Sequence, residues 1–280
     1  MKKIRYLIEA ALVRALISLF RVLPPETASN LGGRIGRNIG PCLSVSRKAT
    51  RHITNSLHTD TKQTQTILHG MWDNLGRVFA EYPHLKTITM HRTELLGVEN
   101  LGNLPTTKGP AIFFASHLAN WEVAAPTLRR QNIDVDLIYR APNNPYVQNV
   151  LDTCRSMDGV LRTYPKSASG MRQVMTALKE GRRIGILIDQ KYNQGVEADF
   201  FGQPAMTSPA FIQLAQKFNC PLIPVQVERL PDAHFRVTVH PAFDITKDKM
   251  VLLNAAHQLL EEWISAAPAQ WLWLHKRWKN

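Results

Sequence analysis

The sequence predicts an α/β protein in which a single mixed, mostly parallel central sheet is flanked by helices and preceded by a membrane-associating helix. With 280 residues, 44% of them hydrophobic, the chain is long enough for one large core. Two short apolar runs, within residues 111–115 and 183–188, are typical of strands buried on both faces. No linker or internal repeat marks a second globular domain. We therefore expect an anchor over residues 1–25 and one domain over residues 26–280.

Helical and strand patterns alternate along that domain. Amphipathic helices are expected over residues 62–81, 120–130, 145–157, 169–180, 209–218 and 250–266. Strands are expected over residues 111–115, 135–140, 159–164, 183–188, 222–227 and 235–239. Glycine and proline mark several boundaries, as in Gly109-Pro110, Gly181 and Pro221. The last two strands follow each other closely and are expected to pair antiparallel.

Residues 1–23 form a basic, amphipathic segment. Glu9 and Arg14 interrupt its apolar stretch, so neither a signal peptide nor a membrane-spanning helix is expected. On a helical wheel one broad face collects Leu7, Ala11, Leu12, Ala15, Leu19 and Val22. We expect an anchor that lies on the anionic cytoplasmic leaflet, with the basic N-terminus near the headgroups. The alternative is an ordinary core helix.

The charge balance points to acidic partners. The formal net charge is +12, which favours nucleic acid, an acidic membrane surface or an acidic carrier protein. The three cysteines are scattered without metal-ligand spacing, which fits a reduced setting and argues against a disulfide or zinc framework.

The C-terminal tail mixes tryptophans with basic residues. Trp271, Trp273 and Trp278 alternate with His275 and three cationic side chains. This mixture is typical of a membrane interface, where indoles lie at headgroup level. Stacking on single-stranded nucleic acid is the competing interpretation.

The segment from Pro110 to Glu122 carries the strongest catalytic signal. A buried strand ends at Ser116, His117 follows, and Glu122 comes five positions after the histidine, at the start of a predicted helix. Because His117 precedes the helix proper, the two side chains can meet. A neutral imidazole paired with a carboxylate can take a proton from a hydroxyl. A structural histidine near a glutamate is the plainer alternative.

Further polar residues follow the later strands. Arg140 and Arg155 would offer fixed positive charge and bidentate donors to phosphates. Lys166 is a weaker candidate of the same kind. Asp189 follows a buried strand, at the end where open α/β sheets place their ligands. These four residues are candidates for substrate binding, and an ordinary surface arginine is the alternative for Arg140 and Arg155.

These motifs resemble a known family. HLANWE, residues 117–122, resembles the H-x4-D/E block of the glycerolipid acyltransferase superfamily, in the H-x3-W-E form of the lipid A late acyltransferases, the lauroyl and myristoyl transferases. Later blocks continue the resemblance: Tyr139-Arg140 before Asn144-Pro145, Asp189-Gln190, the FFGQPA segment at 200–205, and the tail QWLWLHKR. The tail departs from the family at Ala269, where a glutamate is usual.

The resemblance implies an enzyme with a glycerolipid-acyltransferase-like fold. It implies that a fatty acyl chain passes from acyl carrier protein to a hydroxyl of a lipid A precursor bearing Kdo, with His117 as general base and Glu122 as its partner. Acyl carrier protein would be a co-substrate, and no metal or bound cofactor is expected. The implied location is the inner membrane, with the catalytic domain on its cytoplasmic face.

Three alternatives remain at this point. The same chemistry could act on another glycolipid or phospholipid, although the FPEGTR block of glycerol-phosphate acyltransferases is absent. A serine hydrolase would use Ser116 or Ser208, but no G-x-S-x-G motif is present. A non-catalytic nucleic-acid or membrane-binding module would explain the charge and the tryptophans alone.

Overall fold

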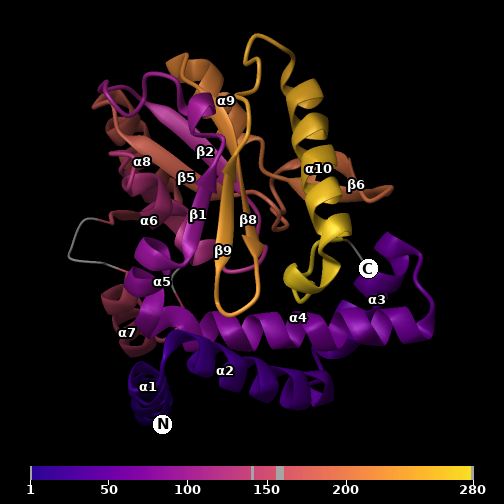
Figure 1. The fold of residues 1–280 in the computed structure, drawn as a ribbon. Coiled ribbons are helices and arrows are strands. Elements are labelled where there is room, and N and C mark those ends of the chain that lie inside the picture. The colour runs from indigo at the N-terminus through magenta and orange to yellow at the C-terminus, as the bar shows by residue number, and fades with distance from the viewer. Residues whose placement is uncertain (1, 140–141, 156–160, 279–280) are drawn as a thin grey trace.

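The computed structural model describes residues 2–139, 142–155 and 161–278, so the predicted substrate residue Arg140 lies outside the described residues. Within them the central sheet has seven strands: β1 (Thr93–Leu96), β2 (Ala111–Ala115), β3 (Val135–Tyr139), β4 (Thr163–Pro165), β5 (Arg183–Leu187), β8 (Leu222–Arg229) and β9 (Phe235–Val239). Their spatial order is β1-β9-β8-β2-β5-β3-β4, and Figure 1 labels the first five strands of this order. Neighbours run parallel except β8 and β9. The predicted mixed, mostly parallel sheet is confirmed.

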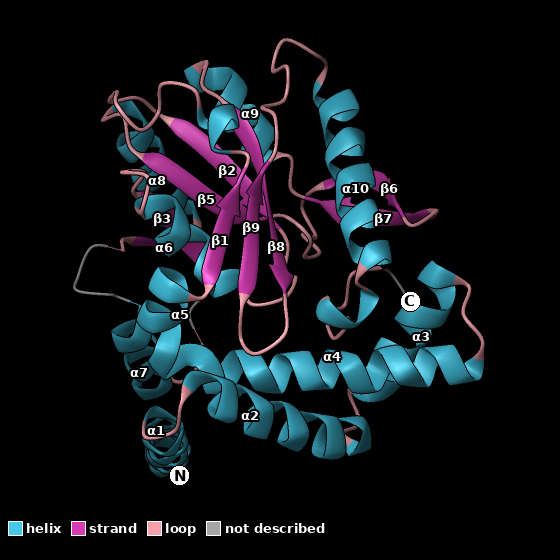
Figure 2. Ribbon diagram, viewed as in Figure 1, coloured by secondary structure: helices cyan, strands magenta, loops and turns pink. Residues whose placement is uncertain are grey.

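Helices cover both faces of this sheet (Figure 2). They are α1 (Lys2–Arg21), α2 (Pro25–Ile39), α3 (Ser46–Leu57), α4 (Thr61–Glu81), α5 (Leu85–His91), α6 (Ala124–Arg129), α7 (Pro145–Arg155), α8 (Ala168–Lys179), α9 (Ala210–Phe218) and α10 (Lys249–Ala266). Successive side chains of β2 point to opposite faces of the sheet and pack in two different hydrophobic cores. Phe114 packs with α8, α9 and α10, whereas Phe113 packs with α5 and α6. A strand covered on both faces has no polar side, which explains its continuous apolar run.

A two-stranded hairpin lies apart from the central sheet and was not predicted. It consists of β6 (Val196–Phe200) and β7 (Gln203–Thr207), paired antiparallel. Phe201 and Gly202 form its turn with φ values of 55° and 67°. Its inner face, including Phe200 and Ala205, packs into the core with α10.

Helix α2 owes its glycines to a close approach to α4, along which it lies in Figure 1. A Cβ at Gly36 would lie 2.1 Å from the carbonyl oxygen of Trp72, and one at Gly76 would lie 2.1 Å from that of Gly32. Since such contacts are far inside van der Waals separation, the glycine-punctuated segment is a helix-packing motif. Helix α4 also contacts α1, and its Asn74 donates to the carbonyl of Ala119, two residues after His117.

Helix α1 packs against the protein by one narrow face only. Ala10, Ile17 and Phe20 are buried. The opposite face exposes Ile4, Leu7, Ile8, Leu12, Leu16 and Leu19. No helix among the described residues is both long and apolar enough to cross a bilayer. The exposed apolar side distinguishes α1 from an ordinary core helix.

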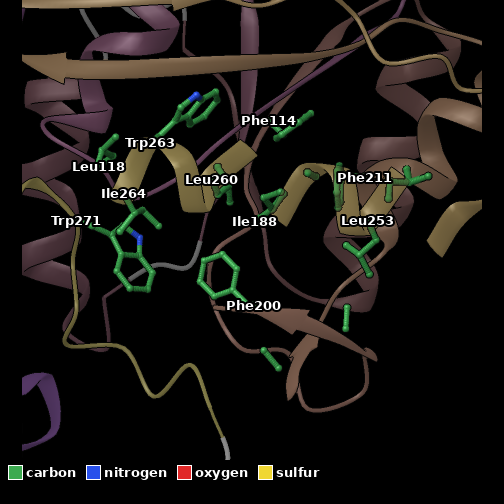
Figure 3. Close-up of a cluster of buried hydrophobic side chains, with 14 of the residues drawn as sticks. Phe114, Leu118, Ile188, Phe200, Phe211, Leu253, Leu260, Trp263, Ile264 and Trp271 are labelled. Atoms are coloured by element: carbon green, nitrogen blue, oxygen red, sulfur yellow. The ribbon is translucent and has the colours of Figure 1, made fainter. Parts of the chain in front are cut away.

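The C-terminal tail corrects the prediction of a tryptophan-rich interface. Trp271, Trp273 and Trp278 are at most 3% exposed, so their rings can stack neither on bases nor among headgroups. Figure 3 shows Trp271 near Phe200, to which its ring centroid is 5.9 Å. Their indole N–H groups donate to Asp189, to the Pro268 carbonyl and to the Phe200 carbonyl, respectively. The tail is therefore part of the core.

Candidate active site

His117 lies just beyond the C-terminal end of β2, beside Asp189 at the end of β5. The parallel pairing of β2 with β5 places Ala115 opposite Leu187, and two further residues on each strand bring His117 beside Asp189. The backbone N–H of His117 donates to Asp189 Oδ2 over 2.9 Å, and Nδ1 lies 2.8 Å from Oδ1. Sheet topology thus joins residues that are far apart in sequence.

The surroundings of Asp189 keep its carboxylate ionised. Its side chain is fully buried, which by itself disfavours the charge, but His117 outweighs that effect and lowers the pKa of Asp189 below its ordinary value. Trp271 Nε1 adds a third donor to the carboxylate, at 2.7 Å from Oδ2. A carboxylate only accepts, so His117 carries its proton on Nδ1 and presents the Nε2 lone pair. This is the tautomer a general base requires.

Glu122 does not contact His117 as predicted. It lies in the 3₁₀ turn Trp121–Val123, and its carboxylate receives Arg155 Nε at 2.8 Å and Nη2 at 2.7 Å. Tyr82 and Trp121 also donate to it. Burial opposes its charge, but Arg155 outweighs burial and lowers the pKa of Glu122. Because the Glu122 carboxylate pairs with the permanently charged Arg155, the predicted His117–Glu122 pairing is wrong.

The residues predicted to bind substrate differ in how far they are free to do so. Arg155 lines the cavity described below, yet its bidentate edge is occupied by Glu122, and its guanidinium lies 4.5 Å from the Tyr139 ring centroid. Lys166 follows β4, lines the same cavity and is exposed. Asp189, predicted as a substrate ligand, is instead occupied by His117 and Trp271.

Two further residues, Gln190 and His275, lie beside His117, and neither was among the predicted site residues. Gln190 Nε2 lies 3.2 Å from His117 Nε2 and 2.9 Å from His275 Nε2. The His117 and His275 rings meet edge-on with centroids 5.0 Å apart. Burial, followed by the charge of His117, lowers the pKa of His275 to about 4, which keeps it neutral near pH 7. The position of Gln190 directly after Asp189 was the available signal.

An apolar cavity of about 400 Å³ extends from His117 between the sheet and α6. Its walls come from β2, β3, β5 and α6, and its mouth from polar residues at the strand ends. Phe113, Leu128, Val135 and Gly185 line the part farthest from His117 along the strands. The size and apolar lining suit a hydrocarbon chain whose reactive end reaches the histidine.

Serine and metal chemistry find no matching arrangement in the described part of the chain. The buried Ser116 Oγ has no hydrogen-bond partner there, and Ser208 Oγ accepts only from the Ala210 N–H at 3.4 Å. Neither hydroxyl contacts a histidine that would activate it. Across residues 2–139, 142–155 and 161–278, no group of three His, Cys, Asp or Glu side chains is positioned to hold a metal ion.

Comparisons with known proteins identify the family of the chain. The family model described as bacterial lipid A biosynthesis acyltransferase matches residues 1–280. The chain is also 24% identical over 197 residues to the lipid A biosynthesis lauroyltransferase of Escherichia coli (strain K12). That alignment covers 67% of this chain and 62% of the relative, so the chain spans less than two thirds of the relative's length. The chain belongs to the bacterial lipid A biosynthesis acyltransferase family.

Proposed function

We propose that this protein transfers a fatty acyl chain from a thioester of acyl carrier protein to a hydroxyl of a lipid A precursor bearing Kdo. The observation that carries the proposal is the His117–Asp189 pair at the mouth of an apolar cavity. Membership of the lipid A acyltransferase family supports the class of acceptor. No metal or bound cofactor is required, because a thioester is already activated.

In the proposed reaction His117 is the general base. The acceptor hydroxyl donates its proton to Nε2 while its oxygen attacks the thioester carbonyl carbon. Asp189 stabilises the imidazolium that forms, through the bond to Nδ1. The tetrahedral intermediate then collapses, the C–S bond breaks, and His117 returns the proton to the leaving thiolate. Glu122 and Arg155 form a neutralised wall of the cavity.

The cavity would hold the acyl chain. It follows β2 from His117 to Phe113, and at about 3.3 Å per residue its depth is roughly 13 Å. An extended polypeptide advances about 1.2 Å per covalent bond, and a hydrocarbon of similar geometry would place about ten bonds in that depth. Each buried methylene contributes about 0.8 kcal/mol, so the cavity supplies affinity as well as selection by length.

The charge around the mouth suits acidic partners. Lys48 of α3 and Lys166 lie close enough to His275 to disfavour its protonation, in addition to the larger effects of burial and His117. Acyl carrier protein and a phosphorylated acceptor are both acidic, and a cationic rim speeds such encounters. Another anionic glycolipid or phospholipid acceptor would satisfy the same rim and is the alternative.

The membrane would be the source of the acceptor. The exposed apolar face of α1 is flanked by basic residues, as in helices that lie on anionic leaflets. Asn144 Nδ2 donates to the Tyr6 carbonyl and to Glu9 on α1, while Asn144 itself precedes α7, which ends at Arg155 in the cavity wall. Helix α1 also packs along α7 and against the turn Tyr82–His84, whose Tyr82 donates to Glu122 in the cavity wall, so α1 lies beside the site. We propose an inner-membrane location with the catalytic domain on the cytoplasmic face.

The activity test uses purified protein in detergent, with radiolabelled acyl carrier protein and a tetraacylated, Kdo-bearing lipid A precursor. We expect product from the wild type and a loss of 100-fold or more in His117→Ala, as for removal of a general base. The matched control is His69→Ala, an exposed histidine on α4. No product with this or any other lipid acceptor, or full activity in His117→Ala, would overturn the proposal.

The membrane test is flotation with vesicles containing anionic lipid. We expect binding by the wild type and its loss when Leu12 and Leu16 of α1 are both replaced by serine. Replacement of the similarly exposed Leu96 and Val98 by serine is the control and should leave binding intact. Equal binding by the two double variants would remove α1 as the anchor.

A further inference from the structure

We propose that the side-chain amide of Gln190 donates a hydrogen bond to the thioester carbonyl oxygen as that oxygen becomes negatively charged, and that His275 holds the amide in place. The inference rests on the proposed acyl transfer and supplies the oxyanion donor which that reaction needs. Gln190 would be a catalytic residue, and His275 a positioning residue.

The hydrogen-bond directions follow from the partners of His117. Its Nδ1 proton faces the Asp189 carboxylate, so Nε2 has a lone pair and must accept. The group 3.2 Å from that lone pair is therefore the NH₂ of Gln190, whose second N–H faces His275 Nε2 at 2.9 Å. Both amide protons thus point at imidazole lone pairs.

His275 is suited to anchor the amide. Burial and the neighbouring His117 keep it neutral near pH 7, with a pKa of about 4, so one ring nitrogen has a lone pair. The Gln190 N–H that faces Nε2 assigns the lone pair to that nitrogen. It extends from the core-bound tail, between the buried Trp273 and the fully buried Arg277. Because that tail is fixed on both sides, the bond from Gln190 to His275 has a defined direction.

Substrate binding would replace the hydrogen bond from Gln190 to His117 and keep the one from Gln190 to His275. The acceptor hydroxyl must donate to His117 Nε2, which displaces the Gln190 N–H from that atom. The released N–H then lies close to the reacting carbon, as an oxyanion donor must. The O–H bond breaks as the C–O bond forms, the proton moves to His117, and the carbonyl electron pair moves to the oxygen that accepts from Gln190. Breakage of the C–S bond restores the carbonyl.

Arg155 is the rival donor in the cavity wall, and its contacts favour Gln190. Arg155 directs Nε and Nη2 at Glu122, and its Nη1, which has no hydrogen-bond partner among the described residues, lies 3.6 Å from Asp152 Oδ1. A guanidinium whose charge is already shared by two carboxylates gains less from a further anion. Gln190 instead contacts the base itself. A reacting atom beside His117 Nε2 is therefore also beside the Gln190 amide.

The test replaces Gln190 by methionine, which keeps the length and removes both donors. We expect kcat to fall about 100-fold with KM little changed. The matched control is Gln194→Met, a glutamine in an exposed position of the following loop, and it should retain kcat. His275→Leu should lower kcat by a smaller factor, and His275→Gln, which again offers an acceptor, should restore part of the loss.

A donor in which sulfur replaces the carbonyl oxygen tests the contact itself. Sulfur accepts hydrogen bonds weakly, so the wild type should use the dithioester much more slowly than the thioester. Gln190→Met should bring the two rates close together, which a purely structural role for Gln190 would not do. An unchanged kcat, or an unchanged rate ratio, in Gln190→Met would overturn the inference.

These outcomes separate the inference from the function on which it rests. If the wild type transfers no acyl group, or does so equally without His117, the proposed function fails first. If transfer depends on His117 while Gln190→Met keeps the full preference for the thioester, only the role of Gln190 is wrong.

Discussion

Two buried carboxylates belong to the site, Glu122 in the cavity wall and Asp189 behind His117, and they differ in their partners. Asp189 faces His117, an imidazole that can gain and lose a proton, whereas Glu122 faces Arg155, which stays charged. The Asp189 and Glu122 side chains are 0% and 6% exposed, so burial does not distinguish them. Only the His117–Asp189 pair can accept and release a proton during a reaction, because its cationic partner is titratable. The other pair can fix the shape and neutrality of the wall.

The largest effect on stability should come from breaking the ion pair between Glu122 and Arg155. Glu122→Gln leaves the Arg155 guanidinium buried without its counter-charge, and we expect the free energy of unfolding to fall by about 3 kcal/mol. Adding Arg155→Met should recover much of the loss, because the uncompensated charge is then gone. Urea denaturation monitored by tryptophan fluorescence measures both. Stability equal to wild type in Glu122→Gln would show that the pair is not a structural wall.

The histidines should dominate the pH dependence of stability above pH 4. The pKa of His257 is lowered to about 4, first by burial and then by Arg277, and that of His275 is also about 4. The pKa of a histidine in the unfolded chain is about 6.5. Between pH 6.5 and pH 4 the unfolded chain therefore binds more protons than the folded protein, and acidification destabilises the fold. His257 alone would contribute a slope of up to ~1.4 kcal/mol per pH unit.

The measurement is the free energy of unfolding from pH 7 to pH 4. His257→Gln should flatten the slope, while the exposed His58→Gln should leave it unchanged. The Glu122–Arg155 pair contributes little in this window, since the lowered pKa of Glu122 keeps the carboxylate ionised there. A wild-type stability that is flat from pH 6.5 to pH 4 would contradict the assignment of neutral, buried histidines.

The smallest expected effect concerns the far end of the cavity. A Cβ at Gly185 would lie 2.8 Å from Leu137 Cδ2 and 2.9 Å from Val135 Cγ1, and the flexible Leu137 can move into the cavity. Gly185→Ala should therefore shift preference to a shorter acyl chain, by about 10-fold in the ratio of kcat/KM values. Gly109→Ala, at a position with open space, is the control. An unchanged preference would place the chain elsewhere.

The sequence predicted the sheet well because strand patterns are local. The buried runs that became β2 and β5 and the antiparallel β8–β9 pair are readable within each segment. The β6–β7 hairpin was not, since Pro204 within a strand argues against one and the turn at Phe201 and Gly202 is recognised only by its φ values.

The site was harder to predict because its contacts are not local. The spacing of His117 and Glu122 suggested a pair, but the carboxylate that reaches His117 is 72 residues away and depends on the register of β2 with β5. Arg155 lies in the cavity wall, but its Nε and Nη2 already contact Glu122, which the sequence does not show. Likewise, composition cannot tell that Trp271 is a buried donor to Asp189.

The most direct test compares kcat for acyl transfer in Asp189→Asn and Glu122→Gln, each checked for folding by near-ultraviolet circular dichroism. We expect Asp189→Asn to lower kcat 100-fold or more, because His117 loses both the acceptor that fixes its tautomer and the charge that stabilises its protonated form. Folded Glu122→Gln should lose less than about 10-fold, since Glu122 does not contact the base. A large loss of kcat in Glu122→Gln, with Asp189→Asn near wild type, would contradict the account.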